Sequence, residues 1–198
     1  RVPCAQLKDQ ISSLFLKYRQ LGVAVPAGIE VAWHTVNAML TYLDSEAQDS
    51  RDPDDMPVVL AWDQADAFPN CWRSSLFKNV VKHMPTLLSY TAQCYEGSGQ
   101  IMAVSDSKLV KTWDCSTGVW QGDPLGTHHM MFAIIDFLQA MLDKFTPENV
   151  FNSEQSSRRI TAQQISVADD LTHVTRRRHV IDLARFVVQE APKHGVVL

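Results

Sequence analysis

Residues 165–174 are Ile-Ser-Val-Ala-Asp-Asp-Leu-Thr-His-Val, a largely apolar and β-branched run that two adjacent carboxylates interrupt. The apolar residues on either side predict two strands, so Asp169 and Asp170 are expected at the tight turn of a hairpin. Neighbouring anions repel each other and lose solvation when partly buried, and a bound cation relieves both effects. Hard divalent ions such as Mg²⁺ prefer carboxylate oxygens. The run therefore predicts either a metal-binding turn or a solvated Asp-Asp turn.

A third carboxylate follows another predicted strand. Residues 57–62, Pro-Val-Val-Leu-Ala-Trp, form an apolar run between turn formers, as is typical of a buried strand. Asp63 stands at its carboxyl end, where a side chain can project into a cleft beside the sheet. A helical pattern of apolar residues then passes through Leu76 and Val80.

Residues 118–126, Gly-Val-Trp-Gln-Gly-Asp-Pro-Leu-Gly, are dense in turn formers and precede a predicted apolar helix over about 125–145. Glycine permits close approach of the backbone to a ligand. Asp123 and Pro124 suit the N-cap and first residue of that helix. Free N–H groups at a helix start can meet a phosphate. Taken alone, this segment predicts only a boundary between a loop and a helix.

The remaining pattern alternates helices with short strands. Residues 44–56 are acidic and polar and are expected to form a surface loop. The predicted elements are helices over about 5–20, 29–43 and 86–94, a hairpin of 100–104 and 108–113, a strand over 160–168, and an amphipathic helix from about 181 to 194.

Composition bounds the class of protein. With 198 residues and 45% hydrophobic content, the chain suits one or two domains with a buried core. No apolar run approaches membrane-spanning length. The four scattered cysteines show no C-x-x-C spacing, which favours a reduced, intracellular protein. A formal net charge of −4 is not that of a typical nucleic-acid-binding domain, although arginines gather at 158–159 and 176–178.

Three blocks in order resemble the palm of a reverse transcriptase, especially those of non-LTR retrotransposons. Residues 63–68, Asp-Gln-Ala-Asp-Ala-Phe, match the family's D-x-x-x-A-F block. Residues 118–126 are similar to its G-x-x-Q-G-D-P-L-G block, and Val-Ala-Asp-Asp at 167–170 resembles its Y-A-D-D or F-A-D-D box. Residues 193–198, Lys-His-Gly-Val-Val-Leu, resemble the start of its G-L-x-L-N-x-x-K segment.

The resemblance implies an α+β fold: a right-hand polymerase palm with a small antiparallel sheet backed by helices, part of the fingers and no thumb. Residues 1–56 would be a helical segment on the fingers side, and residues 57–198 the palm. The implied activity is RNA-directed DNA synthesis by two-metal nucleotidyl transfer to a primer 3′-hydroxyl. Asp63, Asp169 and Asp170 would be the catalytic residues and metal ligands.

The same resemblance implies a nucleotide site and a set of partners. The backbone at Asp66 and Ala67 would lie along the triphosphate, Phe68 would press against the sugar, and Gln121 and Gly122 would line the nucleotide and template pocket. The implied cofactor is Mg²⁺, with Mn²⁺ as an alternative. The implied partners are an RNA template, a DNA primer and deoxyribonucleoside triphosphates, with a larger ribonucleoprotein or protein assembly as a further possibility and no membrane segment.

Some residues depart from the family pattern, and two other functions stay open. Val167 replaces the usual aromatic residue, and His128 and His129 stand where relatives carry apolar residues; we expect these histidines to serve local packing. A domesticated or decayed palm could act as a non-catalytic RNA-binding or structural subunit. An RNA-templated RNA polymerase shares the chemistry, but Phe68 argues against it, because a bulky ring under the sugar excludes a ribose 2′-hydroxyl.

Overall fold

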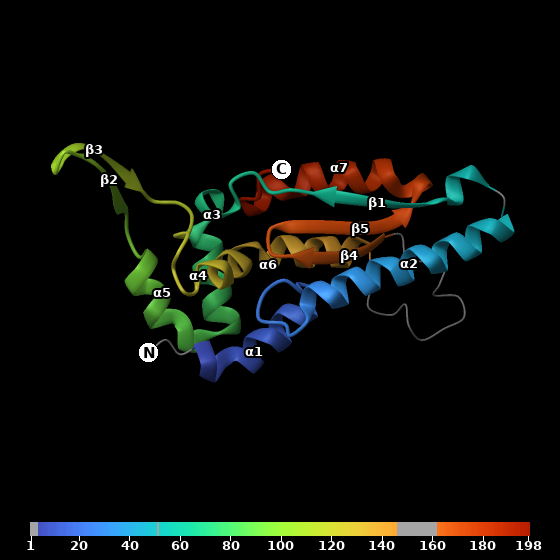
Figure 1. Cartoon of the computed structure of the whole chain (residues 1–198), viewed down its shortest axis with the longest axis horizontal. Coiled ribbons are helices and arrows are strands. Elements are labelled where there is room, and N and C mark those ends of the chain that lie inside the picture. Colours follow the sequence, from blue (N-terminus) through green and yellow to red (C-terminus); the bar gives the residue numbers. More distant parts are fainter. Residues whose placement is uncertain (1–3, 51, 146–161) are drawn as a thin grey trace.

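The computed structural model describes residues 4–50, 52–145 and 162–198 (Figure 1). Seven helices and five strands make up this part of the chain, with short 3-10 turns between them. The helices are α1 (Cys4–Lys17), α2 (Gly28–Ser50), α3 (Ala67–Asn70), α4 (Arg73–His83), α5 (Leu88–Tyr95), α6 (Gly126–Phe145) and α7 (Val180–Glu190). The strands are β1 (Pro57–Trp62), β2 (Gly99–Ser105), β3 (Lys108–Cys115), β4 (Ala162–Val167) and β5 (Asp170–Arg176).

The central sheet has three antiparallel strands in the order β1-β5-β4. Because side chains alternate along a strand, each face takes every second residue. One face includes Gln164 of β4, whose Nε2 donates to the carbonyl oxygen of Leu138 in α6 at 3.5 Å. The other includes Ile165, which packs in a small cluster with Leu21 and Ala32 of the N-terminal region. Helices therefore cover both faces, while Val59 of β1 stays 45% exposed.

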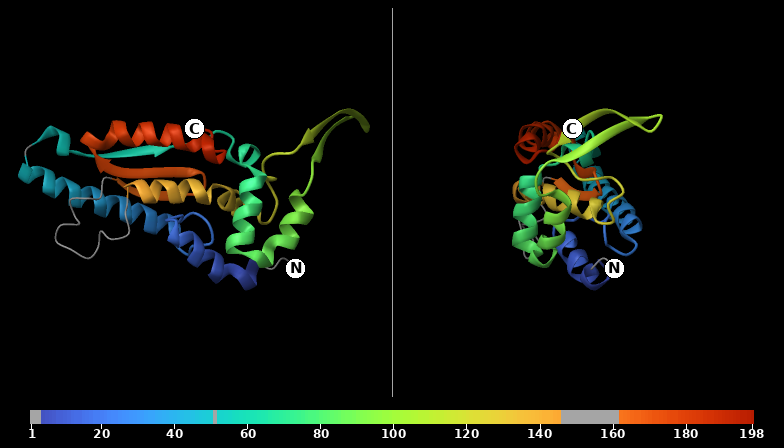
Figure 2. Two further views of the ribbon diagram at one scale, coloured as in Figure 1. Left: turned by 180° about the vertical axis from the view of Figure 1, so that it is seen from behind. Right: turned by 90° about the vertical axis from the view of Figure 1, so that its left-hand side faces the viewer.

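Helix α6 is the centre of the core. Thirteen of its 20 residues are buried, so it contacts neighbours almost all round. It packs against α4, β4 and α7, and the ribbon shows it beneath the sheet along its length (Figures 1 and 2). This burial explains why residues 126–145 are mainly apolar in the sequence, and α6 thereby supports the sheet.

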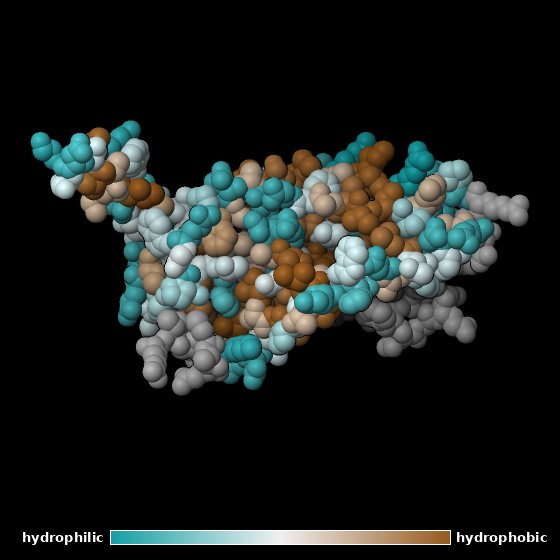
Figure 3. All heavy atoms as spheres, viewed as in Figure 1, coloured by the Kyte–Doolittle hydropathy of each residue, from teal (hydrophilic) through white to brown (hydrophobic). Residues whose placement is uncertain are grey.

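The hairpin of β2 and β3 projects away from the rest of the molecule (Figures 1 and 2). Its strands pair from Gly99 with Cys115 to Ser105 with Lys108. Space-filling spheres show apolar residues on its surface beside polar ones (Figure 3). Its exposed large apolar side chains are those of Ile101, Met102, Val104, Leu109, Val110 and Trp113.

The structure confirms the predicted α+β class with small antiparallel sheets, and both predicted hairpins form. The predicted surface loop at 44–56 is wrong in its first half, because α2 continues to Ser50. Its polar side chains bond within the helix: Gln48 donates to Asp44 at 3.1 Å and Tyr42 to Glu46 at 2.8 Å. The first two residues of the predicted strand 160–168 lie outside the described residues.

Candidate active site

Three carboxylates meet at one end of the central sheet. Asp63 follows β1, Asp169 lies in the turn between β4 and β5, and Asp170, predicted in the turn, is instead the first residue of β5. The last registered pair of β1 and β5 joins Trp62 with Leu171, so Asp63 and Asp170 each lie one residue beyond it. Val167 pairs with Asp170 and closes a tight turn of Ala168 and Asp169. The register therefore places Asp63 and Asp170 next to each other along the ends of paired strands, and the role of these carboxylates as a site stays a prediction.

A buried glutamine from the N-terminal region holds this turn. Gln20 is fully buried, and its Nε2 donates to Ala168 O and to Ser166 Oγ, both at 2.9 Å. Its Oε1 accepts from the backbone N–H groups of Ala168 at 3.0 Å and of Gly22 at 2.8 Å. Ala168 has a φ of 53°, a left-handed conformation that strains a residue with a Cβ. The bonds to Gln20 offset part of that strain.

Two further contacts fix the carboxylate turn. Gln64, the residue after Asp63, donates from Nε2 to Asp169 O at 3.0 Å and so ties the β1 end to the turn. Gly22 lies so close that a Cβ there would stand 2.5 Å from Ala168 N and 2.8 Å from Val167 C. Only glycine fits at position 22 without moving the turn.

The carboxylates influence one another electrostatically. Loss of solvation, followed by the negative charges of Asp169 and Asp63, raises the pKa of Asp170. Across residues 4–50, 52–145 and 162–198, no group of three or more His, Cys, Asp or Glu side chains converges closely enough to hold a metal ion. These carboxylates are the type of ligand that a hard cation prefers, but they do not converge on a single position. Metal binding at this site therefore stays a prediction.

The other two sequence blocks lie against each other. Val119 N donates to Phe68 O at 2.8 Å, and Gly118 N donates to Cys71 O at 2.9 Å. Gly118 has a φ of 68°, and a Cβ there would stand 2.4 Å from Pro69 O. Glycine at this position therefore permits the loop to lie directly on α3.

These blocks share a cavity of about 360 Å³. Among the predicted nucleotide-binding residues, Asp66, Phe68 and Gln121 line it. Ala67 is buried behind them, and Gly122 is not among the lining residues. Asp66 has a φ of 48°, so both carboxylate-bearing segments contain a left-handed non-glycine residue.

Asp123 is a structural carboxylate beside the cavity. It accepts from Tyr90 OH at 2.8 Å, Tyr95 OH at 2.5 Å and Leu125 N at 3.0 Å. Its second oxygen also lies 3.2 Å from Nδ1 of His129. Burial would raise the pKa of Asp123, but the bonds from Tyr95, Leu125 and Tyr90 outweigh it and lower the pKa. Tyr95 OH also accepts from Trp120 N at 3.2 Å, so the network supports the loop of the second block.

His129 has the packing role expected of it. Its ring stacks on Tyr90 with a centroid distance of 5.9 Å and meets Tyr95 edge-on at 5.1 Å. Its Nε2 lies 3.1 Å from Thr91 Oγ1. Burial lowers the pKa of His129 despite the neighbouring Asp123, which favours the neutral ring.

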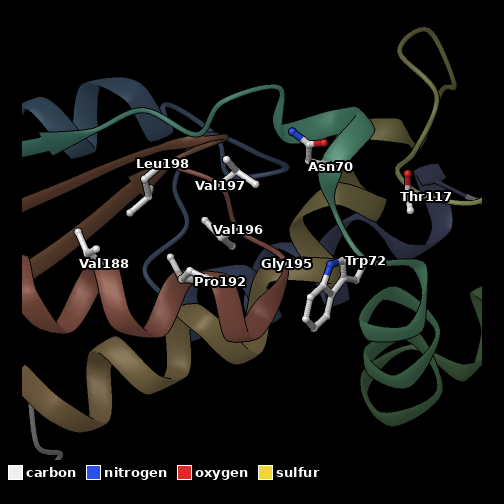
Figure 4. A pocket seen from close by; sticks show the side chains of 10 residues that line it. Asn70, Trp72, Thr117, Val188, Pro192, Gly195, Val196, Val197 and Leu198 are labelled. Atoms are coloured by element: carbon white, nitrogen blue, oxygen red, sulfur yellow. The ribbon is translucent and has the colours of Figure 1, made fainter.

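A larger cavity of about 540 Å³ lies elsewhere (Figure 4). It is mainly apolar, and Trp72, Val188 and the last three residues contribute to its lining. No predicted catalytic or nucleotide-binding residue lines it. The smaller cavity is therefore the one that belongs to the candidate site.

The fold is similar to that of reverse-transcriptase-related enzymes. Apo telomerase from Candida tropicalis truncated from its C-terminal domain matches with a TM-score of 0.59 at 13% identity, covering 98% of this chain and 38% of that chain. Apo telomerase from Candida tropicalis matches with a TM-score of 0.58 at 12% identity, covering 98% of this chain and 35% of that chain. At these identities the likeness shows the fold alone. No protein-family model and no curated protein matches the sequence.

Sequence reasoning missed the residues that position the site. These are Gln20, Gln64, Arg73 and Tyr95, and all but Gln64 lie far in sequence from the nearest of the three carboxylates or show no pattern relative to it. Gln64 lies inside the first block and could have been noted, because a polar side chain beside Asp63 at a strand end has few possible hydrogen-bond partners. The other three become visible only when distant segments are brought together.

No helix among the described residues is both long enough and apolar enough to cross a membrane.

Proposed function

We propose that this chain is the palm and part of the fingers of an RNA-directed DNA polymerase of retroelement origin. The observation that carries the proposal is the proximity of Asp63 to Asp169 and Asp170, where loss of solvation and then the charges of Asp169 and Asp63 raise the pKa of Asp170. The cavity shared by the other two blocks lends support, as does the telomerase-like fold. Residues 57–198 would form the palm and residues 1–56 a helical segment on the fingers side.

Mg²⁺ suits this site by donor type, with Mn²⁺ as the alternative, and Asp63, Asp169 and Asp170 would hold it. Two such ions, when bound, activate a primer 3′-hydroxyl and neutralise the transferred phosphate and the leaving pyrophosphate. The chain's own residues supply position and charge, which carry most of the catalysis in phosphoryl transfer.

The cavity that the first two sequence blocks line would receive the incoming deoxyribonucleoside triphosphate. Phe68 is half-buried and borders the cavity, so its ring would lie against the sugar and exclude a ribose 2′-hydroxyl. Gln121 lines the same cavity from the second block. An RNA template and a DNA primer would complete the substrate set.

The second candidate function is a non-catalytic subunit that binds RNA or supports a larger assembly. The observation that favours it is that no three potential ligands among the described residues converge on a metal position. A domesticated palm that kept its carboxylates would show the same sequence blocks. The two functions differ in one measurable property, primer extension.

The test is primer extension on an RNA template with Mg²⁺, comparing the wild-type chain with Asp169→Asn. We expect extension by the wild type and a loss of at least about a hundredfold in the variant, the scale of losing a preorganised electrostatic group. Thermal stability without metal should hold or rise, because the substitution removes one of three repelling charges.

Asp106→Asn is the matched control, since Asp106 is an exposed turn residue in the projecting hairpin. Equal extension by Asp169→Asn and wild type would remove Asp169 from the mechanism. RNA binding without extension by the wild type, with either Mg²⁺ or Mn²⁺, would favour the non-catalytic subunit.

A further inference from the structure

Arg73 is a buried cation in the wall of the candidate nucleotide cavity. It is the first residue of α4, and only 8% of its surface is exposed. The cavity of about 360 Å³ is lined by Arg73 together with Phe68 and Gln121. Among the described lining residues Arg73 is the only basic side chain, and Asp66, exposed at the surface, is the only acidic one.

The hydrogen-bond partners of Arg73 are neutral. Its Nε donates to Gly118 O at 2.8 Å and its Nη1 to Gly97 O at 2.9 Å. Its Nη2 lies 3.9 Å from Cys115 Sγ, a long contact to a weak acceptor. The guanidinium also stands 5.5 Å from the centre of the Tyr95 ring. Within residues 4–50, 52–145 and 162–198, no carboxylate lies within ion-pair distance of it.

This environment contrasts with that of another arginine in the same chain. Arg176, which is half-buried, pairs with Glu46 and lies 3.8 Å from Asp55. Burying a cation without an anion costs free energy that carbonyl dipoles offset only in part. Arg73 has five N–H donors, and the three described contacts leave some of them unused. An anion in the cavity would supply both the missing charge and the missing acceptors.

We propose that Arg73 binds the polyphosphate of the incoming nucleotide in this cavity. The inference rests on the proposed function, because it takes the cavity to be the nucleotide site. A guanidinium presents paired donors that match phosphate oxygens. Arg73 also holds Gly118 O, so one side chain fixes the loop of the second block and faces the ligand. Phosphate binding in this cavity then does not depend on the metal alone.

The experiment measures binding of inorganic tripolyphosphate to the whole chain without divalent metal, by isothermal titration calorimetry. Arg73→Gln removes the positive charge but keeps an N–H donor for a backbone carbonyl. Arg73→Lys keeps the positive charge but concentrates it on one ammonium group. We expect the affinity to fall about 10- to 100-fold in Arg73→Gln, the range for losing a charged hydrogen bond. Arg73→Lys should bind more tightly than Arg73→Gln.

Lys78→Gln is the control, because Lys78 is an exposed cation on the same helix that pairs with Asp136 at 2.8 Å. It should leave tripolyphosphate binding unchanged. Equal losses in Lys78→Gln and Arg73→Gln would overturn the assignment, since they would indicate attraction by overall charge. Absence of binding by the wild type, or unchanged binding by folded Arg73→Gln, would overturn it as well.

Hydrogen exchange of the wild type keeps the test decisive if Arg73→Gln does not fold. Tripolyphosphate should slow exchange in peptides that cover 66–74 and 116–122, and no local protection would overturn the proposal. Failure of the proposed function is distinguishable, because it is measured by primer extension. If tripolyphosphate binding depends on Arg73 but the chain extends no primer, only the proposed polymerase function is contradicted. If the chain extends a primer but Arg73 has no role in tripolyphosphate binding, only this inference is contradicted.

Discussion

His173 lies fully buried in the middle of β5, and neither of its ring nitrogens has a hydrogen-bond partner. Its registered neighbour on β4 is Gln164, whose Oε1 is also without a partner. Burial lowers the pKa of His173 from 6.5 to about 4, so the ring is neutral at pH 7. The His173 ring therefore fills space in the core, but it forms no hydrogen bond that would stabilise the fold.

His173 should make the folded state sensitive to acid. Between pH 6.5 and 4 the unfolded chain binds a proton at this ring more readily than the folded chain does, so stability falls as pH falls. Across the whole interval the loss is about 3 kcal/mol, and above pH 6.5 this ring causes none. His173→Leu should remove this part of the pH dependence, as urea unfolding at pH 7, 5.5 and 4 would measure.

The control for this prediction is His34→Leu, because His34 is exposed on α2. That variant should keep the acid sensitivity of the wild type. If His173→Leu and the wild type lose the same free energy of unfolding between pH 7 and 4, another group is responsible.

At the scale of elements, the contact between the N-terminal segment and the β4–β5 hairpin decides the geometry of the carboxylate turn. Ser166 N donates to Arg19 O at 3.0 Å and Leu21 N donates to Ser166 O at 2.7 Å, so residues 19–21 run beside the end of β4. Gln20 then bonds on both sides of Ala168. The hairpin is therefore supported from outside the sheet as well as by its own strand pairing.

Gln20→Ala should destabilise the chain and loosen this hairpin. The substitution leaves the N–H groups of Ala168 and Gly22 without their described partner, at about 1–3 kcal/mol for each unsatisfied buried group, while Ala168 O keeps the longer bond from Ser166 Oγ at 3.3 Å. We expect a loss of about 3 kcal/mol in urea unfolding and faster hydrogen exchange in residues 166–170. Gln93→Ala, on the exposed side of α5, should change neither. A Gln20→Ala chain as stable as the wild type would show that water replaces the glutamine without cost.

The elements near the carboxylates could be predicted from the sequence because their signals are local. One apolar run ends at Asp63, and a pair of carboxylates divides another. These two patterns indicate where strands end without knowledge of the fold. The end of α2 could not be predicted in the same way. Its last two turns are polar on every side, and only the bonds within the helix and its contacts with the sheet distinguish it from a loop.

The supporting residues of the site could not be predicted for a different reason. Gln20 bonds to a residue 148 positions away, and Arg73 to one 45 positions away. Glutamine and arginine are common on surfaces, so their types carry no signal without the fold. The carboxylates were identifiable by type and position, whereas their supports depend on the tertiary structure.

At the scale of the whole molecule, the body and the β2–β3 hairpin differ in how they are stabilised. The body has a main core in which α6 packs against α3, α4, α7 and β4. The hairpin exposes nearly all of its side chains, and a two-stranded hairpin alone is marginally stable in water. Its root is tied to the body through Gly97 O and Cys115 Sγ, both of which contact Arg73.

We expect the hairpin to open independently of the body. Amides of residues 100–104 and 109–114 should exchange with solvent at least about a hundredfold faster than those of 171–175, because local opening exposes little apolar surface. Hydrogen-exchange mass spectrometry of the native chain measures this difference. The hairpin amides could instead be as well protected as those of 171–175 at high protein concentration and lose this protection on dilution. That result would indicate that hairpins of different copies associate.

The support of the carboxylate turn by Gln20 has a consequence for the order in which the molecule is completed during synthesis. The glutamine is made before its partners, Ser166 and Ala168, which follow 146 and 148 residues later. Contacts between such distant residues form only after the intervening chain is available, and they are slow to form. The turn therefore reaches its final shape only after the elements between Gln20 and Ala168 have been translated. Any chemistry that depends on its geometry is withheld from a partly made chain.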